Sequence, residues 1–100
     1  MVQLPATLVM PGKTACEGEI ADLSTTGTLF VPQRVADAGV GAHGVFCLAQ
    51  PQASFETVVR IARIASYQSG LAPIEHALGL EFVSPSRVAR ASLDRLTRPN

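Results

Sequence analysis

The chain has 100 residues with a formal net charge of zero, and 47% of them are hydrophobic against 16% that are charged. This balance is typical of one folded domain spanning residues 1–100, and it excludes an intrinsically disordered chain. Without net charge the protein exerts no long-range attraction on nucleic acid, and no apolar run is long enough to cross a bilayer. Neither nucleic-acid binding nor direct membrane insertion is therefore expected.

Apolar runs separated by turn residues predict mainly β-structure in the first four-fifths of the chain. The predicted strands are Leu4–Met10, Cys16–Leu23, Gly27–Val31, Val45–Ala49 and Leu78–Val83. Along Cys16–Leu23 the side chains alternate, so Asp22 is expected on the same face as Ile20, with Ala21 on the opposite face. A looser connection with three glycines is predicted over Gln33–Gly44.

The segment Phe55–Tyr67 fits two kinds of secondary structure. Val58, Ile61 and Ala65 recur at a helical spacing, whereas the β-branched residues of Thr57–Val59 are typical of a strand. We predict a strand, because the neighbouring segments are strands and an antiparallel hairpin needs partners of similar length.

The C-terminal segment predicts a helix over about residues 85–97. Ser84-Pro85-Ser86 supplies a capping residue followed by proline in the first turn. Ala89, Leu93 and Leu96 then recur on one face, which is expected to cover the sheet. Together with strands over about 4–83, this helix predicts an all-β domain, a small antiparallel barrel or curved sheet with one C-terminal helix.

The two cysteines, Cys16 and Cys47, are far apart in the sequence and neither belongs to a metal-binding motif. They are predicted to be reduced thiols of a cytoplasmic protein, with a disulfide between them as the less favoured alternative. Lys13 is the only cation near the N-terminus, so the basic start of a signal peptide is missing.

No residue pattern predicts an enzyme, a metal site or a cofactor. Gly39–Gly44 matches G-x-G-x-x-G, but a strand follows it where the dinucleotide fingerprint requires a helix. His43 and His76 are isolated from each other and from the cysteines. Ser24 lacks the G-x-S-x-G setting of a nucleophilic serine.

The stretch Asp22–Gly27, DLSTTG, places a carboxylate, a hydroxyl and a glycine at a spacing that suits a ligand site. Asp22 and Ser24 alternate along a strand end, so both side chains are expected on one face. Gly27 permits a positive φ or leaves room for a flat ligand. A carboxylate and a hydroxyl side by side accept hydrogen bonds from the donor edge of guanine. The same residues also close ordinary turns, and spacing alone favours that simpler interpretation.

Asp22-x-Ser24-x-x-Gly27 resembles the D/N-x-S-x-x-G motif of PilZ domains, which are bacterial receptors for cyclic di-GMP. Leu78–Phe82 resembles the family's closing G-x-x-F strand, and the helix that follows is similar too, so the resemblance spans about 4–96. It implies a six-stranded antiparallel PilZ-type β-barrel with a terminal helix. It also implies a ligand site at Asp22, Ser24 and Gly27, with cyclic di-GMP as the ligand.

The chain departs from the family in its arginines. Members that bind cyclic di-GMP carry R-x-x-x-R just before the first strand, and the resemblance assigns the phosphates to those arginines. Here no arginine precedes Arg34, so the motif either lay upstream or never existed in this member. Losing two such contacts, at roughly 1.5–3 kcal/mol per charge-assisted bond, weakens binding of a dianion by several orders of magnitude. Arg34, Arg60 or Arg63 substitutes only if the fold brings it near Asp22.

Three functions follow as alternatives. The first is a cyclic di-GMP receptor module controlling motility, pilus or polysaccharide output. The second is a degenerate PilZ domain that does not bind the nucleotide and acts through a protein partner, which an exposed apolar patch at Val35, Val40 and Phe46 would favour. The third is an adaptor domain excised from a larger membrane-bound synthase or signalling protein, since the chain begins close to its first strand.

Overall fold

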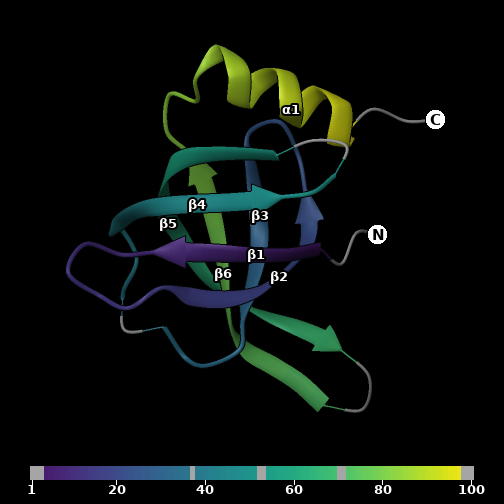
Figure 1. Ribbon diagram of the computed structural model, residues 1–100. Helices are drawn as coiled ribbons and strands as arrows, with labels where there is room; N and C mark the ends of the chain where they lie inside the picture. The colour runs from purple at the N-terminus through teal and green to yellow at the C-terminus, as the bar shows by residue number, and fades with distance from the viewer. Residues whose placement is uncertain (1–3, 37, 52–53, 70–71, 98–100) are drawn as a thin grey trace.

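The computed structural model describes residues 4–36, 38–51, 54–69 and 72–97. The strands of this part of the chain are β1 (Leu4–Val9), β2 (Cys16–Leu23), β3 (Gly27–Pro32), β4 (His43–Ala49), β5 (Ser54–Ser69) and β6 (Ala72–Phe82). They form a closed barrel in the order β1-β2-β3-β6-β5-β4, and every neighbouring pair is antiparallel. One helix, α1 (Arg87–Thr97), follows and lies across one end of the barrel (Figure 1). The predicted six-stranded antiparallel barrel with a C-terminal helix is confirmed.

The ambiguous segment Phe55–Tyr67 is a strand, as predicted, and it belongs to the longest element of the fold. β5 pairs with β6 from Val59 to Ser69, and this hairpin extends beyond the body of the barrel (Figure 1). The prediction that the last strand begins at Leu78 is wrong, because β6 begins at Ala72, the partner of Ser69. The extra length of β6 comes from its pairing with the long β5 and has no strong signal of its own in the sequence.

The connection between β3 and β4 leads through the G-x-G-x-x-G stretch, and the predicted strand follows it. Gly41 has a φ of +94°, and a turn at this point leads into a strand, not into a helix. β4 begins at His43, two residues before the predicted start at Val45. Gly44 lies in this strand, and a Cβ there would lie 2.8 Å from the main-chain oxygen of Val9, so glycine lets β4 approach β1 closely.

The barrel interior is built around aromatic side chains. Phe46 is fully buried, and its ring centroid lies 6.0 Å from those of Phe30 and Phe55 and 6.3 Å from that of Phe82. The predicted exposed patch therefore does not include Phe46, although Val35 and Val40 of the β3–β4 loop are 74% and 62% exposed. The alternation along β4, with Gly44, Phe46 and Leu48 inside, accounts for the burial of Phe46.

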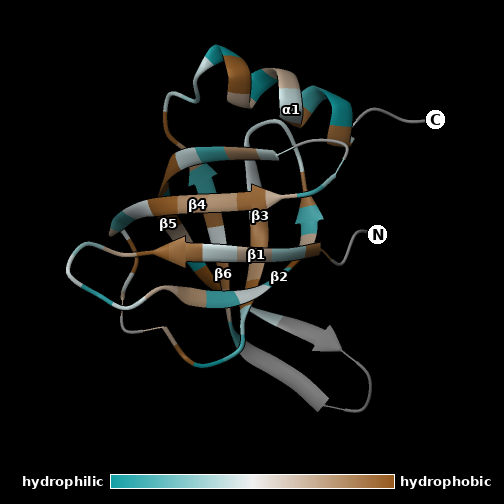
Figure 2. Ribbon diagram, in the orientation of Figure 1, coloured by the Kyte–Doolittle hydropathy of each residue, from teal (hydrophilic) through white to brown (hydrophobic). Residues whose placement is uncertain are grey.

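Helix α1 closes the barrel with one apolar face, as Figure 2 shows by its alternation of hydrophobic and hydrophilic segments. Ala89 and Leu93 are buried in the core, and Leu96 packs against it, so the predicted face is confirmed. The helix begins at Arg87, so Pro85 precedes it, and the cap is Ser86 and not the predicted Ser84. The Oγ of Ser86 accepts a hydrogen bond from the N–H of Ala89 at 3.1 Å. No helix of the described residues is long and apolar enough to cross a membrane.

A β-bulge in β2 overturns one prediction about Asp22. Ile20 pairs with Phe30, but the next pair is Asp22 with Leu29, so Ala21 is an extra residue on this strand. Ile20 and Ala21 are both buried, whereas Asp22 is exposed on the outer surface. Asp22 therefore does not share the face of Ile20. The bulge keeps its carboxylate out of the core, where an unpaired charge would be costly.

Candidate functional site

The turn between β2 and β3 is closed by the hydroxyl of Ser24. Its Oγ accepts hydrogen bonds from the N–H groups of Thr26 and Gly27, each at 3.2 Å. The same oxygen lies 3.2 Å from both the main-chain oxygen of Gly27 and Oγ1 of Thr26, either of which can accept its proton. The main-chain N–H of Ser24 also donates to the Gly27 oxygen at 2.9 Å. The simpler interpretation of this serine, a turn residue, is therefore correct for its hydroxyl.

Asp22 precedes the turn and presents an open carboxylate. Its main-chain oxygen accepts a hydrogen bond from Oγ1 of Thr28 at 2.7 Å, which fixes the backbone on either side of the turn. Among the described residues, the carboxylate itself has no hydrogen-bond or ion-pair partner. An exposed, unpaired carboxylate on a fixed backbone can accept two hydrogen bonds from a bound molecule.

Gly27 is required by the packing of the sheet. Its φ is not positive, unlike that of Gly12 and Gly41. A Cβ at position 27 would collide with the main-chain oxygen of Leu80 and lie 3.6 Å from the Cα of Glu81. A left-handed turn thus does not explain this glycine, and its missing Cβ lets β3 approach β6 closely.

The barrel register places Arg63 in the same row across the sheet as Asp22, with β3 and β6 between them. Asp22 pairs with Leu29, Leu29 with Gly79 and Gly79 with Arg63, so the four residues form one row across β2, β3, β6 and β5. Asp22, Ser24, Gly27 and Arg63 line one pocket of about 210 Å³ on the outside of the barrel. The three predicted site residues are therefore brought together, and Arg63 is with them.

The other arginines considered from the sequence lie elsewhere. Arg60 is paired with Glu81, since its Nη2 lies 3.1 Å and its Nε 3.2 Å from Oε1 of that carboxylate. Arg34 lines a different hollow at the β1–β2 turn. In the sequence alone, Arg60 and Arg63 are two arginines of the same predicted strand. Only the register of the strands shows that Arg63, and not Arg60, lies in the row of Asp22.

The pocket has a hydrogen-bond acceptor, the Asp22 carboxylate, at one end and a positively charged donor, the Arg63 guanidinium, at the other. The Asp22 carboxylate can accept from two N–H groups of a purine edge, and the Arg63 guanidinium can donate to a phosphate or stack on a ring. A volume of about 210 Å³ is smaller than the usual 300–1,000 Å³ of a ligand site. The sequence assigned only Asp22, Ser24 and Gly27 to this site, so Gly79 is among the lining residues that it missed.

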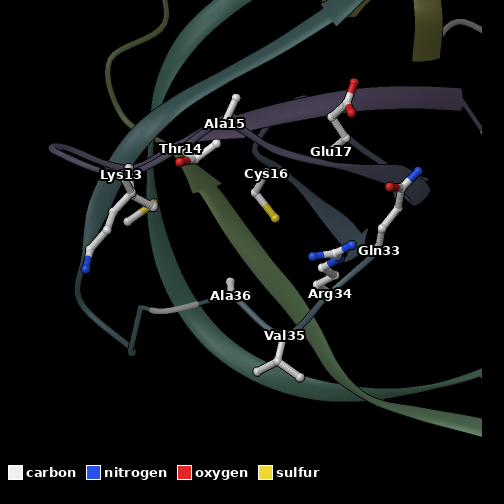
Figure 3. Close-up of a pocket in the computed structure, with 10 residues that line it drawn as sticks. Lys13, Thr14, Ala15, Cys16, Glu17, Gln33, Arg34, Val35 and Ala36 are labelled. Carbon is white, nitrogen blue, oxygen red and sulfur yellow. The ribbon is translucent and has the colours of Figure 1, made fainter.

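A second hollow, of about 570 Å³, lies between the β1–β2 turn and the β3–β4 loop. Figure 3 shows the thiol of Cys16 and the guanidinium of Arg34 pointing into it. Burial raises the pKa of the Cys16 thiol, so the thiol stays protonated and is a poor nucleophile at neutral pH.

Neither cysteine forms a disulfide in the structure. The thiol of Cys47 on β4 donates to Oε2 of Glu56 on β5, with 3.5 Å between the sulfur and the oxygen. Burial, this hydrogen bond and the nearby charge of Glu56 all raise the pKa of the Cys47 thiol. In the part of the chain that the structure describes, no three His, Cys, Asp or Glu side chains gather to hold a metal ion.

Comparison of the sequence with protein-family models gives no match, and comparison with the curated proteins gives none either.

Proposed function

We propose that this chain is a bacterial PilZ-type regulatory domain that receives cyclic di-GMP and controls motility, pilus or polysaccharide output. The observation that carries the proposal is the shared pocket of Asp22, Ser24, Gly27 and Arg63. The six-stranded barrel with its terminal helix supports it further, since the resemblance of the sequence implies that architecture.

In this proposal one guanine lies in the pocket with its donor edge on the Asp22 carboxylate. Arg63 supplies a contact to phosphate that the family takes from upstream arginines, and its guanidinium is free of ion pairs within the described residues. One charge-assisted contact of about 1.5–3 kcal/mol corresponds to roughly 10- to 100-fold in affinity. We therefore expect binding that is measurable but weaker than with a full arginine motif.

The test is isothermal titration of the chain with cyclic di-GMP at low salt. We expect Asp22→Ala and Arg63→Ala each to lower the affinity at least about 10-fold, because each removes a hydrogen-bonded charge. Arg34→Ala is the matched control, since Arg34 lies in a different hollow and its loss leaves the site intact. No heat from the wild-type chain up to high micromolar ligand would reject the proposal for this chain.

A degenerate PilZ domain that acts through a protein partner is the second candidate. Two observations favour it: the Ser24 hydroxyl is used within its own turn, and Val35 and Val40 are 74% and 62% exposed on one loop. The two candidates are distinguished by measuring the motility or secretion output of variants in the bacterium that carries the gene. Under this candidate, Val35→Asp with Val40→Asp abolishes the motility or secretion output and Asp22→Ala leaves it unchanged. The reverse pattern would support the receptor.

A further inference from the structure

A hollow of about 840 Å³ lies between α1 and the turn that joins β2 to β3. Arg87 and Arg90 line it from the start of α1, and Thr25 and Thr26 line it from the turn. Guanidinium forks and hydroxyls are donors that suit the oxygens of a phosphate. Two elements far apart in the sequence thus bring phosphate-binding side chains to one hollow.

The acids in this hollow leave a local excess of positive charge. Glu81 lines it, but its Oε1 lies 3.1 Å from Nη2 of Arg60, so its charge is compensated on the sheet. Asp94 is then the only other acid among its lining residues. No ion pair engages Arg87 or Arg90 in the described residues. Two guanidinium groups therefore face one uncompensated carboxylate, and an anion with two charges gains from this imbalance.

The donors proposed here are side chains, and two main-chain N–H groups at the start of α1 are already bonded within the protein. The N–H of Ala89 donates to Oγ of Ser86 at 3.1 Å, and the N–H of Arg90 to the main-chain oxygen of Ser86 at 2.9 Å. The Nε of Arg90 donates to the main-chain oxygen of Pro85 at 3.2 Å. This bond restrains the guanidinium and leaves its two terminal nitrogens to donate to a ligand.

The hollow and the pocket of Asp22 share a wall. In the turn, Ser24 and Gly27 line the pocket, whereas the two threonines between them line the hollow. On β6, Leu80 lines the pocket and the next residue, Glu81, lines the hollow. A molecule with two anionic groups can therefore lie across the turn, with one group near Arg63 and the other near α1.

We propose that Arg87 and Arg90 bind a phosphate group in this hollow, as a second phosphate subsite of the Asp22 pocket. The inference rests on the proposed function, because the ligand that spans both sites is then cyclic di-GMP. The resemblance expects phosphate-binding arginines upstream of the first strand, whereas here they come from the C-terminal helix. Ligand binding consequently ties α1 to the β2–β3 turn, so the helix is the element that responds to the ligand.

Nuclear magnetic resonance of the arginine Nε–H groups tests this with two probes, cyclic di-GMP and inorganic pyrophosphate. We expect both probes to shift the signals of Arg87 and Arg90, and cyclic di-GMP also to shift that of Arg63. The variant with Arg87→Ala and Arg90→Ala should lose about 10- to 100-fold in affinity for both probes. Arg95→Ala is the matched control, because Arg95 lies in the last turn of α1 and outside the hollow.

The two probes separate the inference from the proposed function. Full affinity for cyclic di-GMP in the Arg87→Ala, Arg90→Ala variant, with loss in Arg63→Ala, would overturn the subsite and leave the receptor proposal standing. If cyclic di-GMP does not bind the wild type, shifts of Arg87 and Arg90 with pyrophosphate still support a phosphate site, while the receptor proposal fails. No shift of these two signals with either probe overturns the subsite.

Discussion

The side chain of Arg63 lies directly over Gly79, its partner in the β5–β6 ladder. A Cβ at position 79 would stand 2.7 Å from Cγ of Arg63 and 3.1 Å from its Nε. Glycine thus gives the arginine room to extend across β6, along the row that ends at Asp22. Gly79 thus makes room for Arg63, and the proposed role of the pocket depends on this missing Cβ.

Gly79→Ala should weaken cyclic di-GMP binding by up to about 10-fold while the barrel stays folded. The methyl group displaces a flexible side chain and no backbone, so the free energy of unfolding should change by less than about 1 kcal/mol. Titration and urea unfolding measure the two effects. Gly39→Ala is the control, because a Cβ there meets nothing within 4 Å. Equal affinity in wild type and Gly79→Ala would contradict the role of Gly79.

Gly27→Ala should instead destabilise the fold. The Cβ would meet the main-chain oxygen of Leu80, which is held in the β3–β6 ladder and cannot move aside cheaply. We expect a loss of about 2–3 kcal/mol, the cost of strong overpacking, measured by urea unfolding against Gly39→Ala. If Gly27→Ala keeps the stability of the wild type and only weakens ligand binding, the glycine is needed for the ligand and not for the packing of the sheet.

Phe46→Ala should be the most damaging of these substitutions. Phe46 is fully buried and contacts three other phenylalanine rings at 6.0 to 6.3 Å between centroids. Truncation leaves a cavity in a closed barrel, at a cost of about 3–5 kcal/mol in the free energy of unfolding. Val35→Ala, at a side chain that is 74% exposed, should change it by less than about 0.5 kcal/mol. Similar values for the two variants would contradict the position of Phe46 in the core.

The Cys47 thiol should ionise at a higher pH than an ordinary cysteine. Burial is the largest cause of its raised pKa, and the hydrogen bond and charge of Glu56 add to it. A raised pKa in the folded state means that folding favours the protonated thiol. The thiol therefore contributes to the free energy of unfolding, and this contribution is fully present below the pKa of the unfolded state. It is lost as the pH rises through the folded pKa.

Glu56→Gln should lower the pKa of Cys47 without changing that of Cys16, whose pKa is raised by burial alone. The pH dependence of thiolate absorbance in the Cys16→Ser background measures the first effect, and the Cys47→Ser background serves as its control. An unchanged titration of Cys47 after Glu56→Gln would mean that the carboxylate does not act on the thiol.

Asp94→Asn should strengthen pyrophosphate binding by about 2- to 5-fold, because it removes the uncompensated acid from the hollow of Arg87 and Arg90. The gain should fade in high salt, since the charges are exposed and screened. Glu56→Gln is the matched control, because it removes an equal charge from β5, outside the hollow. Weaker binding in Asp94→Asn would show that this carboxylate orients an arginine and does not repel the anion.

Local patterns in the sequence determined the elements of this protein. Alternation and β-branched residues are properties of a few neighbouring side chains, so they predicted most of the strands. At Phe55–Tyr67 the local patterns fitted a helix equally well, and the neighbouring strands led to the prediction of a strand. The face of Ala89 and Leu93, which is also a local pattern, predicted the helix, whereas the predicted cap, Ser84 before Pro85, was wrong by two residues because Ser86 caps α1. The turn at Ser24 was also predictable, because its hydrogen bonds reach no further than three residues.

Only the tertiary structure decided which groups meet at the candidate site. The bulge at Ala21, the reason for Gly27 and the row from Asp22 to Arg63 all depend on the register between strands. Register is set by packing between segments up to about fifty residues apart, and a shift of one residue moves a side chain to the other face. The sequence therefore predicted half of the candidate site, Asp22 and its turn, and the closed barrel decided that Arg63 lines the same pocket.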